Sequence, residues 1–359
     1  MTPVELSRTV LRAVRRAVDD GELSVAVPER VVVAPPGPGG CGEYATNVAL
    51  RLARPAGRTP QHVAEVLRTR LLRTDGIGDV VITGPGFLNI SLCEADVSVA
   101  LVTEVLGAGD IPYGHLPEGS REPVLLRGAA DVRAFVHLDA LARTLRAQGH
   151  FVRVGFDAPP ASEWGAVLGE GGIEGAPLED EQSADAQDSR PPVTVRPVPA
   201  PADPLPLGRD AARWALLRPA ARDRPRISGE HLEQRESNPL FRVRYAHART
   251  RALARNAADL GFRPEPGPVG VSGNRPLLTA LADHPRVLAA AARHRAPDRL
   301  ARHLVTVADA TQPLLPAVLP LGAEKPSAVH RARLALADAA GTVLADGLSL
   351  LGIDAPDHL

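Results

Sequence analysis

Residues Asn238–Arg255 read NPLFRVRYAHARTRALAR. Asn238 is a suitable N-cap and Pro239 a suitable first helical residue, and no helix breaker follows before Gly261. The stretch therefore predicts one helix of about five turns, at ~3.6 residues per turn. It is rich in arginine, with aromatic rings near its start. Such a helix can hold a phosphate backbone and stack an unpaired base, but a core helix whose arginines are solvated or paired has the same pattern.

This stretch resembles the anticodon-binding domain of class I arginyl-tRNA synthetases, where the matching segment reads approximately NPvyYvQYAHAR. Two flanking segments resemble the same domain: LGRDAARWALLR at 207–218 and the C-terminal residues 332–359, where Leu359 replaces the usual methionine. The resemblance implies an all-α, DALR-type anticodon-binding helical bundle over residues 207–359, with tRNA or tRNA-like RNA as its partner. It places candidate RNA contacts on the central helix, at Arg242, Arg244, Tyr245, His247 and Arg249.

Charge and composition narrow the class of protein. The 359 residues carry a formal net charge of −1, but residues 207–359 carry +7 and residues 1–206 carry −8, an asymmetry that favours a polyanionic partner on one side. The only lysine is Lys325, and two cysteines cannot build a disulfide framework or a four-thiolate metal site. No histidine spacing indicates a metal site, and no cofactor is predicted. Because no apolar run approaches ~20 residues, we expect a cytosolic protein with no membrane partner.

An α+β N-terminal domain is predicted for residues 1–118, with helices at 2–19, 44–53 and 60–72 and strands at 31–33, 80–82 and 87–92. The segments EYATNVALRLARPAGRTP and GPGFLNISL resemble the additional N-terminal domain of the same family, which grips the tRNA elbow. That resemblance implies base contacts from Phe87 and Asn89, because a ring stacks on a base and an amide pairs with its edge. The alternatives are a Phe87 buried in the sheet and an Asn89 bonded to a neighbouring strand.

A strand–helix–strand pattern at 123–127, 134–149 and 151–156 predicts one βαβ unit in residues 119–168. DALARTLRAQGHFVRV resembles the start of the family's Rossmann-like catalytic domain, which follows an HxGH signature. The alignment puts that signature on four positions without histidine: Gly128, Ala129, Ala130 and Asp131. Donors of this kind are each worth ~2.7–4 kcal/mol to a transition state. With a single lysine, the family's lysine-rich second signature cannot be present either. We therefore expect a vestigial unit without catalytic residues.

Residues 169–206 are acidic in their first half and proline-rich in their second, which predicts a linker. Further helices are predicted at 209–217, 276–281, 285–295 and 297–310, with a last pair over 325–351.

The sequence thus predicts a non-catalytic protein, related to arginyl-tRNA synthetase, that binds tRNA through elbow- and anticodon-binding domains. The alternative is a protein-interaction or regulatory module without RNA affinity. RNA binding requires Arg242, Arg244, Arg249 and Arg251 to be exposed together, whereas the alternative tolerates their pairing with acids. An active arginine–tRNA ligase is a third interpretation, and it conflicts with the missing histidines.

Overall fold

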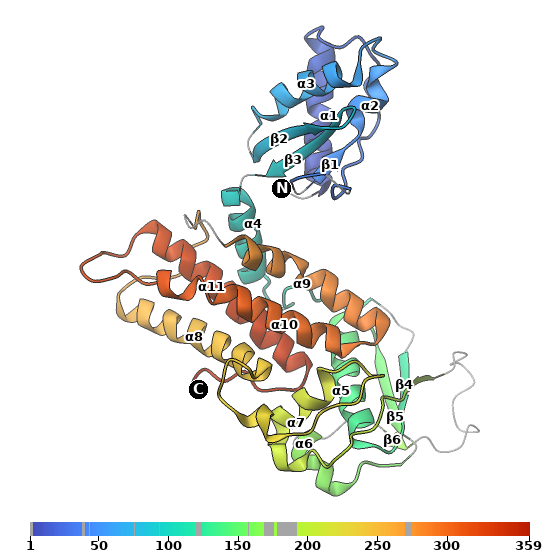
Figure 1. Ribbon diagram of the computed structural model, residues 1–359, viewed down its shortest axis with the longest axis vertical. Helices are drawn as coiled ribbons and strands as arrows, with labels where there is room; N and C mark the ends of the chain where they lie inside the picture. Colours follow the sequence, from blue (N-terminus) through green and yellow to red (C-terminus); the bar gives the residue numbers. More distant parts are fainter. Residues whose placement is uncertain are drawn as a thin grey trace. The chain divides into compact units, whose positions relative to one another are not determined.

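The computed structural model forms two compact units, residues 1–100 and 101–359, each with its own hydrophobic core (Figure 1). The division falls earlier than the boundary expected at residue 118, because α4 (Glu94–Leu106) carries Leu101, Val102 and Val105 into the core of the second unit. The residues that the structure describes are 3–37, 40–42, 44–74, 76–92, 94–119, 124–156, 158–168, 176–177, 192–269 and 274–359.

In the first unit, three helices pack against an antiparallel sheet whose strand order is β1-β3-β2. The helices are α1 (Pro3–Asp19), α2 (Val48–Ala53) and α3 (Pro60–Leu71), and the strands are β1 (Tyr44–Thr46), β2 (Ile77–Thr83) and β3 (Phe87–Leu92). The α+β class is as expected, but two elements differ. The helix expected at 44–53 begins only at Val48, because the three residues of β1 pair with β3. The strand expected at 31–33 is reduced to a bridge between Ala34 and Ala45.

The second unit contains a parallel sheet of strand order β6-β5-β4-β7. Helix α5 (Val132–Ala147) connects β4 (Val124–Gly128) to the parallel strand β5 (Val152–Phe156). The other two strands are short: β6 (Ala176–Pro177) and β7 (Val193–Val195). Both lie within the expected linker 169–206, so the linker prediction is wrong for them. Residues 169–175 and 178–191 of that segment lie outside the described residues.

Five long helices complete the second unit (Figure 1): α7 (Gly208–Leu217), α8 (Pro239–Asp259), α9 (Arg275–His294), α10 (Pro297–Thr311) and α11 (Ala328–Leu350). Two of the expected pairs of helices are single helices. The helices expected at 276–281 and 285–295 are one helix, because α9 continues through Pro285, where burial of Leu281 and Leu288 offsets the lost backbone hydrogen bond. The last pair is likewise the single helix α11.

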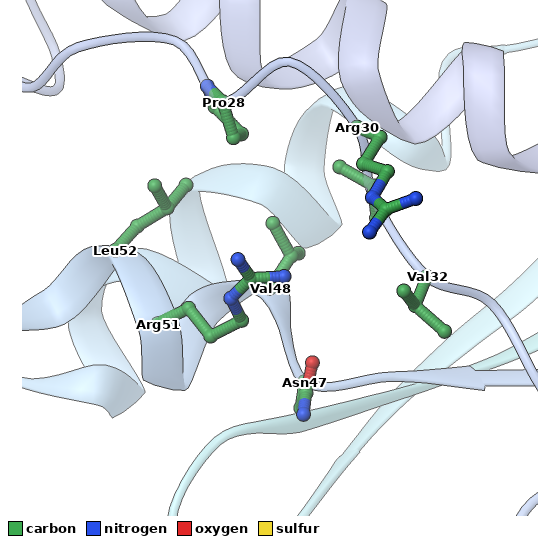
Figure 2. Close-up of a pocket in the computed structure, with 8 residues that line it drawn as sticks. Pro28, Arg30, Val32, Asn47, Val48, Arg51 and Leu52 are labelled. Atoms are coloured by element: carbon green, nitrogen blue, oxygen red, sulfur yellow. The ribbon is translucent and has the colours of Figure 1, made fainter.

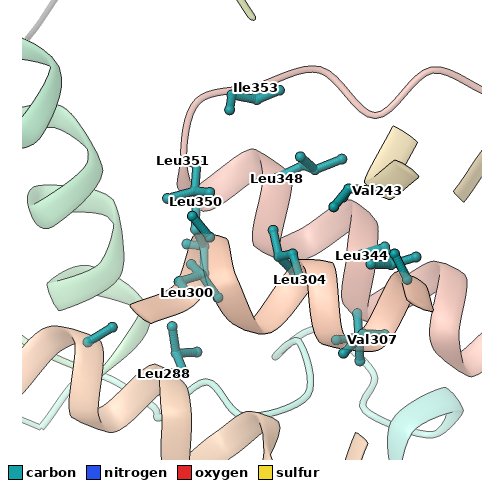
Figure 3. Packing of buried hydrophobic residues seen from close by; sticks show 14 of the residues in the cluster. Val243, Leu288, Leu300, Leu304, Val307, Leu344, Leu348, Leu350, Leu351 and Ile353 are labelled. Atoms are coloured by element: carbon teal, nitrogen blue, oxygen red, sulfur yellow. The ribbon is translucent and has the colours of Figure 1, made fainter. Parts of the chain in front are cut away.

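Side chains from α8, α10 and α11 interlock in the core of this bundle (Figure 3). Val243 of α8 and Leu304 of α10 lie beside Leu344 and Leu348 of α11, all at most 1% exposed. The same hydrophobic cluster extends into the βαβ unit through Leu126 of β4 and Phe135 of α5. The βαβ unit and the helical bundle therefore fold around one core.

Two fully buried arginines fasten the βαβ unit to the bundle. Arg213 of α7 forms an ion pair with Asp139 of α5, and its Nε donates to the Leu351 carbonyl at 2.9 Å. Arg133, in the first turn of α5, donates to five backbone carbonyls at 2.6–3.3 Å, those of Val198, Leu216, Pro219, Ala220 and Asp223. Three of these carbonyls lie at or just after the end of α7, so Arg133 also caps that helix.

Candidate nucleic-acid interface

The start of α8 has the cap that its sequence predicts. The Oδ1 atom of Asn238 accepts a hydrogen bond from the Leu240 N–H at 3.1 Å. The Nδ2 atom of Asn238 donates to the carbonyls of His231 and Glu233, at 3.0 and 2.8 Å. The same residue therefore begins the helix and fixes the preceding segment against it.

Most of the arginines of α8 are paired rather than exposed together. Arg242 lies 2.8 Å from Asp309 of α10, and Arg244 lies 3.4 Å from Asp210 of α7. Arg251 lies 3.3 Å from Asp338 of α11 and 3.5 Å from Asp357. The expectation of a joint arginine surface is therefore wrong, because three neighbouring helices each carry an aspartate that faces α8.

Arg249 is the exception among the candidate arginines. Its side chain is exposed, and no described residue forms an ion pair with it. The rings of Phe241 and Tyr245 lie 5.6 Å apart between centroids, and Tyr245 is 37% exposed. Because Phe241, Tyr245 and Arg249 follow one another at four-residue spacing, they share one face of α8. We call these three residues the α8 strip; it combines a stacking surface with a free cation.

His247 does not belong to this surface. It is 4% exposed, and its Nδ1 lies 3.1 Å from the carbonyl oxygen of Pro356. Burial lowers the pKa of His247 below its usual range, only partly opposed by that hydrogen bond, which favours the neutral imidazole. In this structure His247 therefore docks the C-terminal tail onto α8, and an RNA contact at His247 stays a prediction.

A groove of about 710 Å³ lies between the end of α7 and the start of α8. Its charged lining comprises four exposed arginines and two glutamates: Arg218, Arg224, Arg226, Arg235, Glu230 and Glu233. Although Arg218 is exposed as a residue, its guanidinium is partly buried. That burial, and then repulsion from Arg242 and Arg302, lowers the pKa of Arg218, so these three guanidinium groups lie near one another. These residues are not among the contacts predicted from the sequence, although the density of arginine in RPAARDRPR at 218–226 is a signal for them.

The two candidate residues of the first unit have different environments. Phe87 is 41% exposed, so it is not part of the sheet core. Asn89 is 2% exposed, and its Nδ2 donates to Thr83 Oγ1 at 2.7 Å and to the Val81 carbonyl at 3.3 Å. The ring is therefore accessible, whereas the amide is bonded to the neighbouring strand, as the alternative interpretation had it.

The four positions aligned with the HxGH signature, Gly128, Ala129, Ala130 and Asp131, lie where β4 meets α5. Asp131 is the N-cap of α5, and its Oδ1 accepts hydrogen bonds from the N–H groups of Arg133 and Ala134 at 3.0 and 3.2 Å. A helix N-terminus is a ready site for phosphate, but here a carboxylate of the chain takes its first free donors. Gly128 ends β4 so close to Leu138 that a Cβ atom there would lie 2.4 Å from its Cδ1.

The described residues contain neither a candidate metal site nor a candidate membrane-spanning helix. None of their His, Cys, Asp and Glu side chains form a group of three suited to holding a metal ion. No helix among them has the length and apolar content needed to cross a lipid bilayer.

Comparison with known proteins shows what these units are similar to. Residues 5–92 match the family model "Arginyl tRNA synthetase N terminal domain", and residues 243–359 match "DALR anticodon binding domain". The chain is 43% identical over 165 residues to the arginine–tRNA ligase of Frankia alni, an alignment that covers 42% of this chain and 29% of the enzyme. It is 27% identical to the arginine–tRNA ligase of Renibacterium salmoninarum over 551 alignment positions that cover 100% of both chains.

Solved structures share the fold. The arginyl-tRNA synthetase of Thermus thermophilus matches with a TM-score of 0.53 at 16% identity, covering 100% of both chains. That of Plasmodium falciparum matches with a TM-score of 0.55 at 10% identity, covering 99% of both. Because the 551-position alignment reaches both ends of a 359-residue chain, the missing length lies inside the alignment. The chain therefore belongs to the arginyl-tRNA synthetase family, of which it carries the N-terminal domain and the DALR anticodon-binding domain.

Proposed function

We propose that this chain binds tRNA, or RNA folded like tRNA, without attaching an amino acid to it. The observation that carries the proposal is the match of residues 243–359 to an anticodon-binding domain, together with an arginine-lined groove at the start of that domain's first helix. The α8 strip would stack unpaired bases on Phe241 and Tyr245, with Arg249 beside them. The arginines of the groove would contact the phosphates on either side.

The contacts proposed here differ from those expected from the sequence. Tyr245 and Arg249 remain, whereas His247 is buried and Arg244 is held by Asp210, with both side chains at most 25% exposed. Arg218, Arg224, Arg226 and Arg235 take their place as phosphate contacts. Arg242 remains a candidate, because its pair with Asp309 is partly exposed and a phosphate can compete with an exposed carboxylate.

The proposal that the chain does not aminoacylate tRNA is based on the junction of β4 and α5. The side chain of Asp131 occupies the N–H groups that a nucleotide phosphate would use, and its negative charge repels one. The neighbouring Arg133 donates to backbone carbonyls instead of to a ligand. Both features support a βαβ unit, vestigial relative to a catalytic Rossmann-like domain, that serves as a platform for the bundle.

Binding is tested with the full chain and bulk tRNA by fluorescence anisotropy between 50 and 200 mM salt, the range over which phosphate contacts are lost. We expect the affinity to fall steeply with salt. Arg218→Ala and Arg249→Ala should each reduce the slope of log K against log salt by about one. Arg263→Ala is the matched control, since it removes an exposed arginine outside the groove and the strip. A flat salt response would refute the proposal.

The second part of the proposal, that the chain does not aminoacylate tRNA, is tested separately. The assay is arginine-dependent exchange of pyrophosphate into ATP, with an active arginine–tRNA ligase as the positive control. We expect no exchange above background from this chain. Exchange that depends on arginine would show that the chain is a ligase despite Asp131.

A second function is favoured by one specific observation, the pairing of Arg242, Arg244 and Arg251 with aspartates. Paired arginines are what a protein-interaction or regulatory module without RNA affinity would tolerate. The same titration separates the two functions: absence of tRNA binding even at 50 mM salt, where nonspecific electrostatic binding is strongest, would leave the interaction module as the better proposal.

A further inference from the structure

A small hollow in the first unit is lined by three polar side chains (Figure 2). Its volume is about 90 Å³. Pro28, Val31, Val32, Val48 and Leu52 make the apolar part of the wall. Arg30 and Arg51 extend toward one another from the two sides, and Asn47 lies beside them (Figure 2).

These three polar side chains make no ion pair, hydrogen bond or helix cap with the described part of the chain. Arg30 and Arg51 are exposed and form no ion pair or hydrogen bond with any described residue. Asn47 precedes α2 but makes no side-chain cap, in contrast to Thr59 and Asn238, which cap α3 and α8. None of the residues that line the hollow is acidic, so two guanidinium groups face it without a counter-charge.

Other residues hold the walls of the hollow in place. Thr46 Oγ1 donates to the Val32 carbonyl at 2.8 Å and accepts from the Val48 N–H at 3.3 Å, which joins one wall to the other. Ser7 of α1 donates to the Val31 carbonyl. The walls are thus fixed without help from Arg30, Asn47 or Arg51, so these three side chains are available to a ligand.

We propose that Arg30, Arg51 and Asn47 form a binding site for a single phosphate group. A hollow of about 90 Å³ is far below the ~300–1,000 Å³ of sites that enclose a drug-sized ligand, which excludes a whole nucleotide but admits one tetrahedral oxyanion. Guanidinium groups match phosphate oxygens with paired N–H donors, and the asparagine amide adds two more. No lining carboxylate opposes the anion.

The phosphate can come from the backbone of an RNA or from a free phosphate. The RNA source rests on the tRNA binding proposed above, and it would give the first unit a contact with the RNA backbone. Since a phosphodiester carries no base identity, this contact would position the RNA without selecting its sequence.

The first arm of the test uses inorganic phosphate and the full chain with ¹⁵N-labelled arginine. We expect two side-chain Nε–H signals to shift on titration. They are assigned as the signals lost in Arg30→Ala and in Arg51→Ala. The Arg54 signal is the internal control, because Arg54 is the exposed C-cap residue that follows α2 and does not line the hollow. Unchanged Arg30 and Arg51 signals at phosphate concentrations that saturate other anion sites would overturn the proposal.

The second arm measures tRNA binding against salt for Arg51→Ala, Arg30→Ala and Asn47→Ala, with Arg54→Ala as the charge-matched control. We expect each arginine variant of the site to reduce the slope by about one relative to Arg54→Ala. A phosphate response in the first arm with no difference in the second assigns the site to free phosphate. If tRNA does not bind at all, the proposed function fails, and the first arm still decides whether the site exists.

Discussion

Arg242 and Asp309 join α8 to α10 through both carboxylate oxygens: the Nη1 atom of Arg242 lies 2.8 Å from Oδ1 and 2.9 Å from Oδ2. The two side chains are 31% and 46% exposed. Ion pairs at such exposure contribute only ~0–1 kcal/mol, because water screens them. Asp309 would therefore compete only weakly with a phosphate for Arg242 under the proposed function.

Asp309→Asn tests this competition. Removing the carboxylate frees Arg242 and deletes the negative charge beside it. We therefore expect tRNA to bind about two- to fivefold more tightly at low salt, for an interaction of up to ~1 kcal/mol. The measurement is the same anisotropy titration. Asp283→Asn is the matched control, because Asp283 is also a partly exposed aspartate paired with an arginine, at 3.0 Å. Equal effects of the two variants would show that only total charge matters.

Arg213→Met and Arg143→Met probe two arginines that share one aspartate. Arg213 is fully buried against Asp139, whereas the side chain of Arg143 is 38% exposed. Losing the buried partner should cost about 3–5 kcal/mol, and losing the exposed one under about 1 kcal/mol. Urea unfolding followed by tryptophan fluorescence measures both, because Trp164 and Trp214 lie in the second unit. A similar loss for both variants would contradict a buried, bundle-fastening role for Arg213.

Gly341→Ala tests the close approach of α8 and α11. A Cβ atom at Gly341 would lie 2.4 Å from the Oγ1 atom of Thr250, a buried residue of α8. We expect a destabilisation of about 1–3 kcal/mol from overpacking. Thr250→Ala in the same chain should recover part of it, so the two changes should not be additive. The exposed neighbour Thr342→Ala serves as the control, within about 0.5 kcal/mol of the parent.

The stability of the second unit should fall as the pH falls below the ordinary histidine pKa of 6.5. Burial, and then the nearby charges of His303 and His115, lowers the pKa of His284 to about 3; burial also lowers the pKa of His303 to about 4. The two rings are stacked with centroids 5.4 Å apart, and His284 has no hydrogen-bond partner among the described residues. The unfolded chain therefore binds protons that the folded chain does not bind, and stability is lost progressively from pH 6.5 down to about 3.

His284→Phe should flatten that pH dependence, because the neutral ring needs no proton and can still stack on Tyr113, whose centroid lies 6.1 Å from that of His284. Urea unfolding at several pH values gives the slope. His294→Gln is the control on the same helix, since His294 is exposed in the last turn of α9. An unchanged slope in His284→Phe would mean that other groups, such as His137, dominate the acid sensitivity.

Features that depend on neighbouring residues could be predicted from the sequence. The proline after Asn238 and the amide of Asn238 itself specify where α8 begins, because both act within one turn of the helix. The βαβ order and the absence of histidine at Gly128–Asp131 were equally local. The break predicted at Pro285 is wrong, because the packing of α9 overrides the tendency of proline to end a helix.

The sequence by itself determined the family, the helix α8 and the absence of histidine from the junction of β4 and α5. Each of these depends on neighbours along the chain. Only the tertiary structure decided which arginines are free and which histidines are buried. Asp309 meets Arg242 from 67 residues away, and Pro356 covers His247 from 109 residues away. The pairing of such distant residues is set by how helices pack, and no pattern within α8 encodes it.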